Sequence, residues 1–331
     1  MINIVFRIDT KCYSPEFRRC LGLASAFIEI DPACQISFLS SCPKYCKDMI
    51  ENLGYFYSDP GGVSWQEWDI EATEKFIKEK NAHLLFVGNR INDRYLKALK
   101  DKVKIVLFDD GTSKIPGGAQ ALINPQINSH LIDYGTSIQL FLGTEVCPLP
   151  SSFDEYSDYS RDNPERVRKI TIITKDLRFS IAGVKLLKML TYAFNAAVIL
   201  SEEDHLTGES LAKEIGLDSR FVVLPAFDII KRLASSDLII ISPDMLNEVL
   251  FFRLPNIILT ESESQLASYA AKNGISLHIP IHNISKDTVK LVEKLMEDQE
   301  ERNRISARMA ELIDGLGRFR LAQEILDYFK D

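Results

Sequence analysis

The sequence predicts an α/β protein with two doubly wound domains, each a parallel sheet covered by helices on both faces. Short apolar runs alternate with longer segments of helical periodicity along almost the whole chain. The run Leu-Ile-Ile-Ile at 238–241 is apolar on both faces, which is typical of a strand inside a parallel sheet. A chain of 331 residues also exceeds one usual core, so two domains of roughly 150 residues each are expected.

The first half begins with an alternating strand at 2–8, after which Pro15 opens a helix whose apolar residues recur at helical spacing. Further strands are expected at 35–40, 83–87, 103–108, 120–123 and 137–142, with helices near 43–53, 66–80 and 91–99. This alternation indicates parallel strands joined by crossover helices. We therefore assign residues 1–155 to the first domain.

Residues 150–168 are short of aliphatic side chains and rich in turn formers, which is typical of a linker. Strand and helix patterns then resume, with strands at 169–174, 196–200, 220–224, 237–241, 255–259 and 276–279, and helices near 180–193, 208–216, 227–234, 243–253, 262–273 and 285–298. The remaining residues have a helical pattern to the end of the chain. We therefore expect a boundary inside 150–168 and a second domain at 165–331, with a long C-terminal helix that crosses back toward the first domain.

The composition excludes several classes of function. The net charge of −8 and the lack of a Lys/Arg-rich stretch argue against nucleic-acid binding, which needs a concentrated basic surface. No apolar segment approaches the ~20 residues that span a bilayer, and the N-terminus meets a charge too early for a signal peptide, so we expect a cytoplasmic protein. Cys42 and Cys46 form a lone C-x3-C pair, so we expect structural thiols, no metal and no cofactor.

Polar side chains gather directly after the strand expected at 237–241. Ser242 can cap the following helix, and Asp244, Asn247 and Glu248 share one face of it at spacing i, i+3, i+4. Open α/β sheets bind ligands at the carboxyl ends of their strands, so these residues form a candidate binding site. A solvated helix start is the alternative interpretation.

Two further carboxylates, Asp109 and Asp110, directly follow the strand expected at 103–108. They would lie at its carboxyl edge and could serve a site there. A turn made by the Asp-Gly pair that ends at Gly111 is the alternative.

Several stretches resemble one family of the GT-B class, the nucleotide-sugar hydrolases of pseudaminic acid biosynthesis and the related spore-coat polysaccharide proteins. The matches occur in order over nearly the whole chain and comprise Arg7-Ile8-Asp9, Arg19-Cys20-Leu21 with Ala24, Asp109-Asp110, Asn124, the stretch from Leu142-Gly143 to Phe153, Asn247-Glu248, Gln265 and Asp314-Gly315-Leu316-Gly317. The resemblance implies two Rossmann-like domains with the ligand in an interdomain cleft. It also implies removal of the nucleotide diphosphate from a UDP-linked amino sugar, with uridine held by the C-terminal domain.

The resemblance also assigns roles to single residues. Glu248 would bind the ribose hydroxyls, lining the cleft partly exposed beside Asn247, and Gln265 would lie over the sugar or diphosphate. For Gln265, a capping box with Ser262 is the alternative. The other residues expected to bind substrate are Arg19, Asp110, Asn124, Lys175 and Ser242.

The departures from the family concern its glycine-rich turns. The family's Gly-x-Gly-His loop is here Tyr13-Ser14-Pro15-Glu16, so Glu16 stands where the histidine is the expected catalytic base. Thr174-Lys175-Asp176 and Ser242-Pro243-Asp244 replace the other two turns. Glycine lets backbone N–H groups approach a phosphate at a helix N-terminus. The Ser-Pro-acid turns lack one donor and add a carboxylate, so we expect weakened diphosphate binding unless Arg18, Arg19 or Lys175 supplies a positive charge.

Three functions remain open. The first is a nucleotide-sugar hydrolase or transferase, with Glu16 as the base and Asp9 and Asp109 as supporting polar groups. The second is a catalytically silent relative that binds a sugar, a nucleotide or a protein partner. The third is a GT-B glycosyltransferase with an acceptor alcohol in place of water. We favour an enzyme, because Asn247-Glu248 and Asp109-Asp110 are retained.

Overall fold

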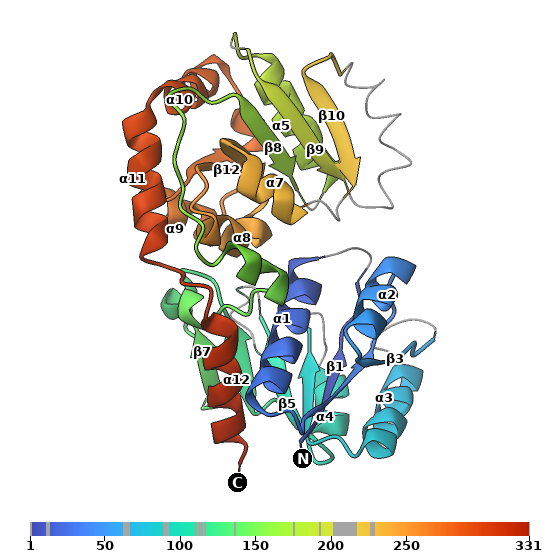
Figure 1. Cartoon of the computed structure of the whole chain (residues 1–331). Helices are drawn as coiled ribbons and strands as arrows, with labels where there is room; N and C mark the ends of the chain where they lie inside the picture. Colours follow the sequence, from blue (N-terminus) through green and yellow to red (C-terminus); the bar gives the residue numbers. More distant parts are fainter. Residues whose placement is uncertain are drawn as a thin grey trace. The chain divides into compact units, whose positions relative to one another are not determined.

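The computed structural model describes residues 2–10, 14–61, 67–88, 93–109, 111, 115, 117–135, 137–174, 176–191, 193–200, 217–225 and 229–330. The chain divides into two compact units, Met1–Ser151 with Gly315–Asp331, and Ser152–Asp314 (Figure 1). Each unit contains one sheet in which every strand pairing is parallel, with helices between the strands. The predicted α/β fold with two doubly wound domains is therefore confirmed.

The sheet of the first unit has the strand order β3-β2-β1-β4-β5-β6-β7. Its strands are β1 (Asn3–Arg7), β2 (Gln35–Leu39), β3 (Phe56–Ser58), β4 (Leu84–Val87), β5 (Lys104–Phe108), β6 (Ala121–Asn124) and β7 (Gln139–Leu142). The helices of the unit are α1 (Pro15–Ile30), α2 (Lys44–Asn52), α3 (Glu67–Lys80), α4 (Asp93–Leu99) and α12 (Gly317–Tyr328). The short edge strand β3 is the one strand of this sheet that the sequence analysis missed.

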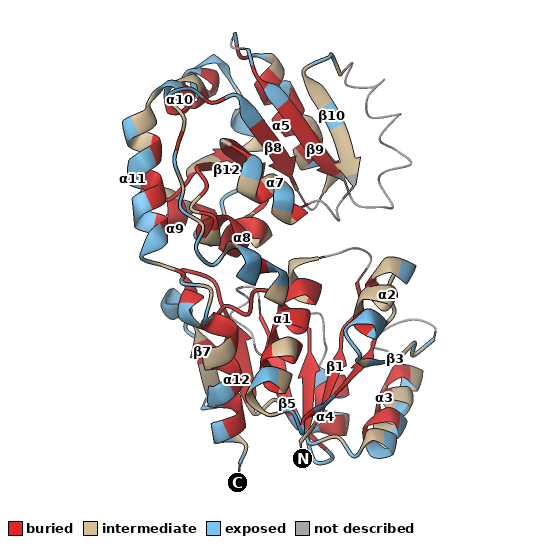
Figure 2. Cartoon of the chain, in the orientation of Figure 1, coloured by how far each residue is buried: buried red, intermediate tan, exposed pale blue. Residues whose placement is uncertain are grey.

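Successive residues of β1 serve opposite faces of this sheet. Phe6 stacks on Phe38 at 5.0 Å and on Phe86 at 4.8 Å between ring centroids, in the core formed with α1, α2 and α12. Val5 and Leu85 belong to the other core, with α3 and α4. Figure 2 shows that buried residues are concentrated in the strands and on the helix faces turned toward them. Burial of one large apolar side chain stabilises the fold by about 1.5–3 kcal/mol. Because both faces of the sheet are covered by helices, every residue of a strand can contribute in this way, and the strands are therefore continuous apolar runs.

The end of the chain is helical but not one helix. α11 (Gln299–Ala310) and α12 are separate, and Gly315 between them adopts φ 81°, a left-handed conformation that favours glycine. Leu321 and Ile325 of α12 are buried in the core beside α1. The expected single long helix is thus two helices, and α12 packs in the first unit, toward which the terminal helix was expected to cross.

The sheet of the second unit has the order β10-β9-β8-β11-β12-β13. Its strands are β8 (Lys169–Ile173), β9 (Asn195–Leu200), β10 (Phe221–Pro225), β11 (Leu238–Ile241), β12 (Asn256–Thr260) and β13 (Leu277–Pro280). The helices are α5 (Leu177–Lys188), α7 (Ile229–Ser235), α8 (Leu246–Phe251), α9 (Gln265–Lys272), α10 (Lys286–Glu297) and α11. The helix expected at 208–216 lies outside the described residues.

Both strand orders reverse direction at one point, between β1 and β4 in the first unit and between β8 and β11 in the second. Ligands of open α/β sheets bind at such a switch point, at the carboxyl ends of the strands. The residues that follow β1, β4, β8 and β11 are therefore the places to look for a site.

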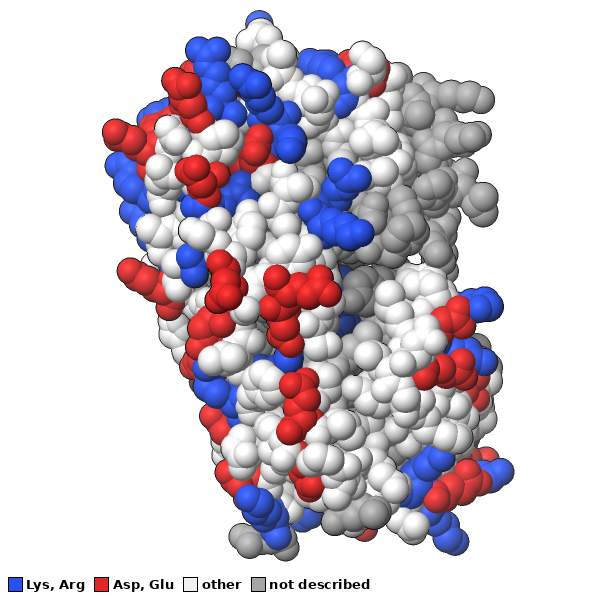
Figure 3. Space-filling view, viewed as in Figure 1, with Lys and Arg blue, Asp and Glu red and all other residues white. Residues whose placement is uncertain are grey.

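The apolar length of the helices and the distribution of surface charge indicate which classes of partner the protein can bind. Of the helices that the structure describes, none is long and apolar enough to cross a membrane. On the face shown in Figure 3, acidic and basic side chains of the described residues are interspersed and form no continuous basic area. This distribution agrees with the net charge of −8 and offers no phosphate-tracking surface on that face.

Candidate functional site

The first turn of α1 has the helix start that the sequence predicts. The Ser14 hydroxyl accepts a hydrogen bond from the Phe17 N–H at 3.2 Å, and Pro15 occupies the first helical position. Thr10 on the loop after β1 donates to the Ser14 hydroxyl at 3.1 Å. One N–H of this turn is therefore absent and another already has an acceptor, which leaves the turn poor in donors for a phosphate.

The Glu16 carboxylate lies against Gly88, the residue that follows β4. A Cβ built on Gly88 would stand only 2.1 Å from Glu16 Oε1, so this glycine leaves the space that the carboxylate occupies. β1 and β4 flank the switch point of the sheet. A carboxylate carried by the helix after β1 thus reaches the end of β4, where an open sheet would receive its ligand.

Asp9, just beyond the end of β1, is held from two sides. Arg7 donates to both of its carboxylate oxygens, at 2.5 and 2.9 Å, and the Ser41 N–H donates to Oδ1 at 2.7 Å. The Arg7 side chain is fully buried and also donates to Asp69 at 3.1 and 3.2 Å. Hydrogen bonds to both oxygens fix the orientation of the Asp9 carboxylate and leave it few free acceptor positions. Asp9 therefore fits an orienting role better than a proton-accepting one.

Asp109, Asn124 and Tyr134 form a buried cluster at the carboxyl ends of β5 and β6. Tyr134 donates to Asp109 Oδ2 at 2.6 Å, and Asn124 donates to the Tyr134 oxygen at 2.7 Å. The Gly111 N–H also donates to Asp109 Oδ2 at 2.9 Å. Asp110 lies outside the described residues. Sequence patterns gave no signal for Tyr134, because it lies on an irregular loop.

The two consecutive arginines of α1 are buried. Arg18 is 1% exposed and Arg19 is 4% exposed. Burial, followed by the charge of Glu16, raises the pKa of the neighbouring Cys20 thiol well above its usual value. Arg19 acts on the same thiol in the opposite sense, so Glu16, Arg19 and Cys20 share one electrostatic environment near the helix start.

The α5 helix of the second unit begins with its own carboxylate. Asp176 accepts the Arg178 N–H at 2.8 Å, and its pKa is lowered by the hydrogen bond from the Arg178 guanidinium. This explains why α5 begins at Leu177, earlier than the helix expected at 180–193. Lys175 lies outside the described residues. The anion position at this helix start is therefore occupied by the Asp176 side chain.

Arg178 joins the loops after two non-adjacent strands. Its guanidinium contacts Asp176 at 2.7 Å and Glu261 at 3.0 Å, and these acids follow β8 and β12. β11 lies between those strands, so the pair extends across the carboxyl end of β11. The sequence analysis missed Arg178. The available signal was its position two residues after Asp176, the residue that caps α5.

Ser242 and the short helix after β11 differ from the expectation in two ways. Ser242 donates to Asp244 at 2.5 Å and makes no side-chain cap, and Pro243–Met245 is a 3-10 turn before α8. The single helix expected at 243–253 is thus divided. Asn247 is 4% exposed and Glu248 is 2% exposed, so the expected partial exposure of Glu248 is wrong. The other residues of Leu246–Leu250 are buried as well, so Glu248 lies in the packed part of this short helix.

Gln265 is the first residue of α9 and is exposed. Ser264 is the cap of this helix and accepts the Ala267 N–H at 3.3 Å. The capping box proposed for Ser262 and Gln265 is therefore wrong, because the helix begins two residues later than that pairing requires.

The described residues contain no group of three or more His, Cys, Asp or Glu side chains arranged to hold a metal ion. The side chains described at these switch points are carboxylates, hydroxyls and amides together with the arginines Arg7, Arg19 and Arg178.

Comparison with known proteins identifies the fold. No protein family model and no curated protein matches the sequence. Among solved structures, the chain is similar to S. aureus MnaA in a co-structure with UDP, with a TM-score of 0.71 and 15% identity over 100% of this chain and 97% of that one. It is also similar to the spinosyn forosaminyltransferase SpnP, with a TM-score of 0.70 and 14% identity over 100% of both chains. A third is the UDP-GlcNAc 2-epimerase from Neisseria meningitidis bound to UDP-GlcNAc, with a TM-score of 0.64 and 11% identity over 100% of both chains. At these identities the likeness establishes the GT-B fold and no more.

Proposed function

We propose that the protein binds a nucleotide-linked sugar, with the nucleotide on the second unit, and acts on it as a hydrolase or transferase. The observation that carries this proposal is the placement of Glu248, a carboxylate that is 2% exposed on the helix after the switch-point strand β11. Burial strengthens the hydrogen bonds that a carboxylate accepts, and two vicinal ribose hydroxyls offer two donors to its two oxygens. The UDP and UDP-GlcNAc complexes of proteins with this fold support the same ligand class.

The proposed chemistry uses the first unit. Glu16 acts as the base that activates water or an acceptor alcohol, because its carboxylate reaches the end of β4 at the switch point. Asp9, oriented by Arg7, supports the site through its hydrogen bonds. The resemblance to the pseudaminic-acid hydrolases makes a UDP-linked amino sugar the first substrate to test.

Calorimetric titration with uridine, UMP, UDP and CMP tests the nucleotide site before any assumption about catalysis. We expect Glu248→Gln to weaken uridine and UMP binding by roughly tenfold to a hundredfold, because a charge-assisted hydrogen bond contributes about 1.5–3 kcal/mol. Glu263→Gln removes an exposed carboxylate of the same unit and serves as the matched control. Equal affinity of wild type and Glu248→Gln, or no uridine-nucleotide binding at millimolar concentration, refutes the proposal.

A specific observation favours a second candidate, a catalytically silent binding protein. The starts of α1 and α5 and the turn before α8 each carry their own acid, namely Glu16, Asp176 and Asp244. Each of these acids would repel a diphosphate bound at the same helix start, because two like charges at ~4 Å repel by a few kcal/mol at an effective dielectric of about 20.

The two candidates differ in their affinity for UDP relative to UMP. The silent protein binds UDP no more tightly than UMP, and Pro15→Gly with Glu16→His, or Asp176→Ala, raises its affinity for UDP. Tight UDP binding by the wild type that is lost in Arg178→Ala and unchanged in those variants favours the enzyme.

A further inference from the structure

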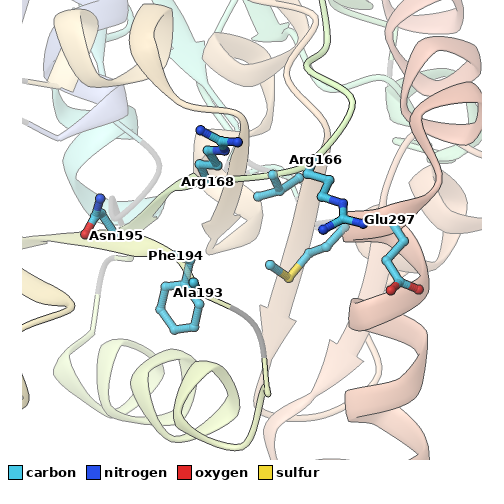
Figure 4. A pocket seen from close by; sticks show the side chains of 8 residues that line it. Arg166, Arg168, Ala193, Phe194, Asn195 and Glu297 are labelled. Atoms are coloured by element: carbon cyan, nitrogen blue, oxygen red, sulfur yellow. The ribbon is translucent and has the colours of Figure 1, made fainter.

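A cavity of about 420 Å³ lies in the second unit, at the amino ends of β8 and β9 (Figure 4). Segments 166–168, 193–195 and 296–297 line it. Asp176 and Ser242 follow the carboxyl ends of β8 and β11, at the opposite edge of the same parallel sheet. The cavity is therefore separate from the proposed nucleotide site, and its volume is in the range of small-molecule sites.

Two arginines stand at the rim of this cavity. Arg166 and Arg168 are two residues apart on the segment before β8, both are exposed and both line the cavity, while Val167 between them is buried. Within the described part of the chain, neither guanidinium has a hydrogen-bonding or ion-pairing partner. The nearby acid Asp237 uses Oδ2 to accept the backbone N–H groups of residues 168 and 169, both at 2.8 Å.

The backbone that carries the arginines is held in place by a buried cation. Arg302, which is fully buried, donates to Glu165 O at 3.2 Å and Met296 O at 2.6 Å, and also to Pro164 and Leu295. These bonds connect the segment before β8 to the end of α10, on two sides of the cavity. A rim that is already ordered loses little conformational freedom when a ligand binds.

The remaining lining combines an apolar wall with few charges. Phe194 (Figure 4) and Met296 contribute the apolar part of the lining and are 5% and 2% exposed, and Asn195 contributes an amide. Arg220 lies over the Phe194 ring, but Asp218 already pairs with it at 2.8 Å. Glu297 is the single carboxylate among the lining residues, against two arginines.

We propose that this cavity binds a small organic anion, whose phosphate or carboxylate meets Arg166 and Arg168 while its flat apolar part packs on Phe194 and Met296. Arginine suits either anionic group because its fork can donate two hydrogen bonds to two oxygens. The site adds a second ligand to the protein, independent of the nucleotide on the other edge of the sheet.

Ligand-observed NMR with phenyl phosphate and benzoate tests the site and separates the two anionic groups. We expect one or both to bind the wild type, and phenol, which has no charge, to bind more weakly. Arg166→Gln with Arg168→Gln should reduce affinity by at least about tenfold, since each lost charge-assisted bond is worth roughly a factor of ten. Glu297→Gln should raise affinity by about two- to threefold, because it removes a competing carboxylate.

Matched controls distinguish this site from general electrostatics and from the nucleotide site. Lys272→Gln with Lys286→Gln removes two exposed positive charges elsewhere on the second unit and should leave binding unchanged. Excess UDP should not displace phenyl phosphate. Binding of neither anion to the wild type, equal affinity in the double arginine variant, or displacement by UDP overturns the proposal.

Discussion

The contact between Glu16 and Gly88 predicts that substitutions at these two positions are energetically coupled. Gly88→Ala would place a Cβ 2.1 Å from Glu16 Oε1, where ordinary van der Waals contact begins at 3.4 Å. The carboxylate must therefore move by more than an ångström. It can do so because it ends a flexible side chain, but it then leaves the switch point between β1 and β4.

The size of the coupling follows from two opposing effects. Gly88 does not have a left-handed φ, so alanine suits its backbone and should stabilise the fold by about 0.4–1 kcal/mol through the unfolded state. With Glu16 present, displacement of the carboxylate costs about 1–2 kcal/mol in rotamer energy and altered hydrogen bonding. Gly88→Ala should thus stabilise a Glu16→Ala protein but not the wild type, with a coupling energy of about 1–2 kcal/mol.

Urea unfolding of the wild type, both single variants and the double variant measures this coupling. The sequence has two tryptophans, Trp65 and Trp68, and Trp68 lies in α3 of the first unit, so a change in its fluorescence reports the unfolding of that unit. Glu16→Asp shortens the side chain by about one bond and should show a smaller coupling to Gly88→Ala. If the two substitutions are additive within about 0.5 kcal/mol, the carboxylate does not rest on Gly88 and our account of the switch point fails.

Three further predictions concern catalysis, packing and pH. Glu16→Gln should abolish release of UDP from a UDP-linked amino sugar while the melting temperature stays nearly unchanged, because the variant loses a base but no packing. Activity near that of the wild type would show that Glu16 is only a carboxylate at the start of a helix. Arg302→Met should lower the free energy of unfolding of the second unit by about 3–5 kcal/mol, because it removes the donor that four backbone carbonyl groups share. Amide hydrogen exchange measures this loss, and protection equal to that of the wild type would show that these hydrogen bonds do not stabilise the unit. The hydrogen bond from Arg220 lowers the pKa of Asp218 to about 2, so this pair should stabilise the protein above about pH 4 and lose its effect as the pH falls toward 2; Asp218→Asn should lack that part of the acid dependence in a series of melts.

Local patterns were sufficient to predict most of the elements. Strands such as β4 and β11 are apolar on both faces because they lie between two layers of helices, and that requirement is written in consecutive residues. The start of α1 at Pro15 with a Ser14 cap follows from groups within four positions of one another. β3 was missed because it is only three residues long and its Phe56 is 49% exposed, so it has neither length nor apolar periodicity.

The candidate site was predictable in its chemistry but not in its contacts. The sequence by itself determined that carboxylates and capping residues follow the strands, because these positions depend on neighbours in the chain. Only the tertiary structure decided that Glu16 meets Gly88, that Tyr134 meets Asp109, and that Arg178 extends across the end of β11 to Glu261. These pairs are 25 to 83 positions apart. They form because the strand order brings separate loops to one edge of a sheet, and no periodicity within a segment encodes that order.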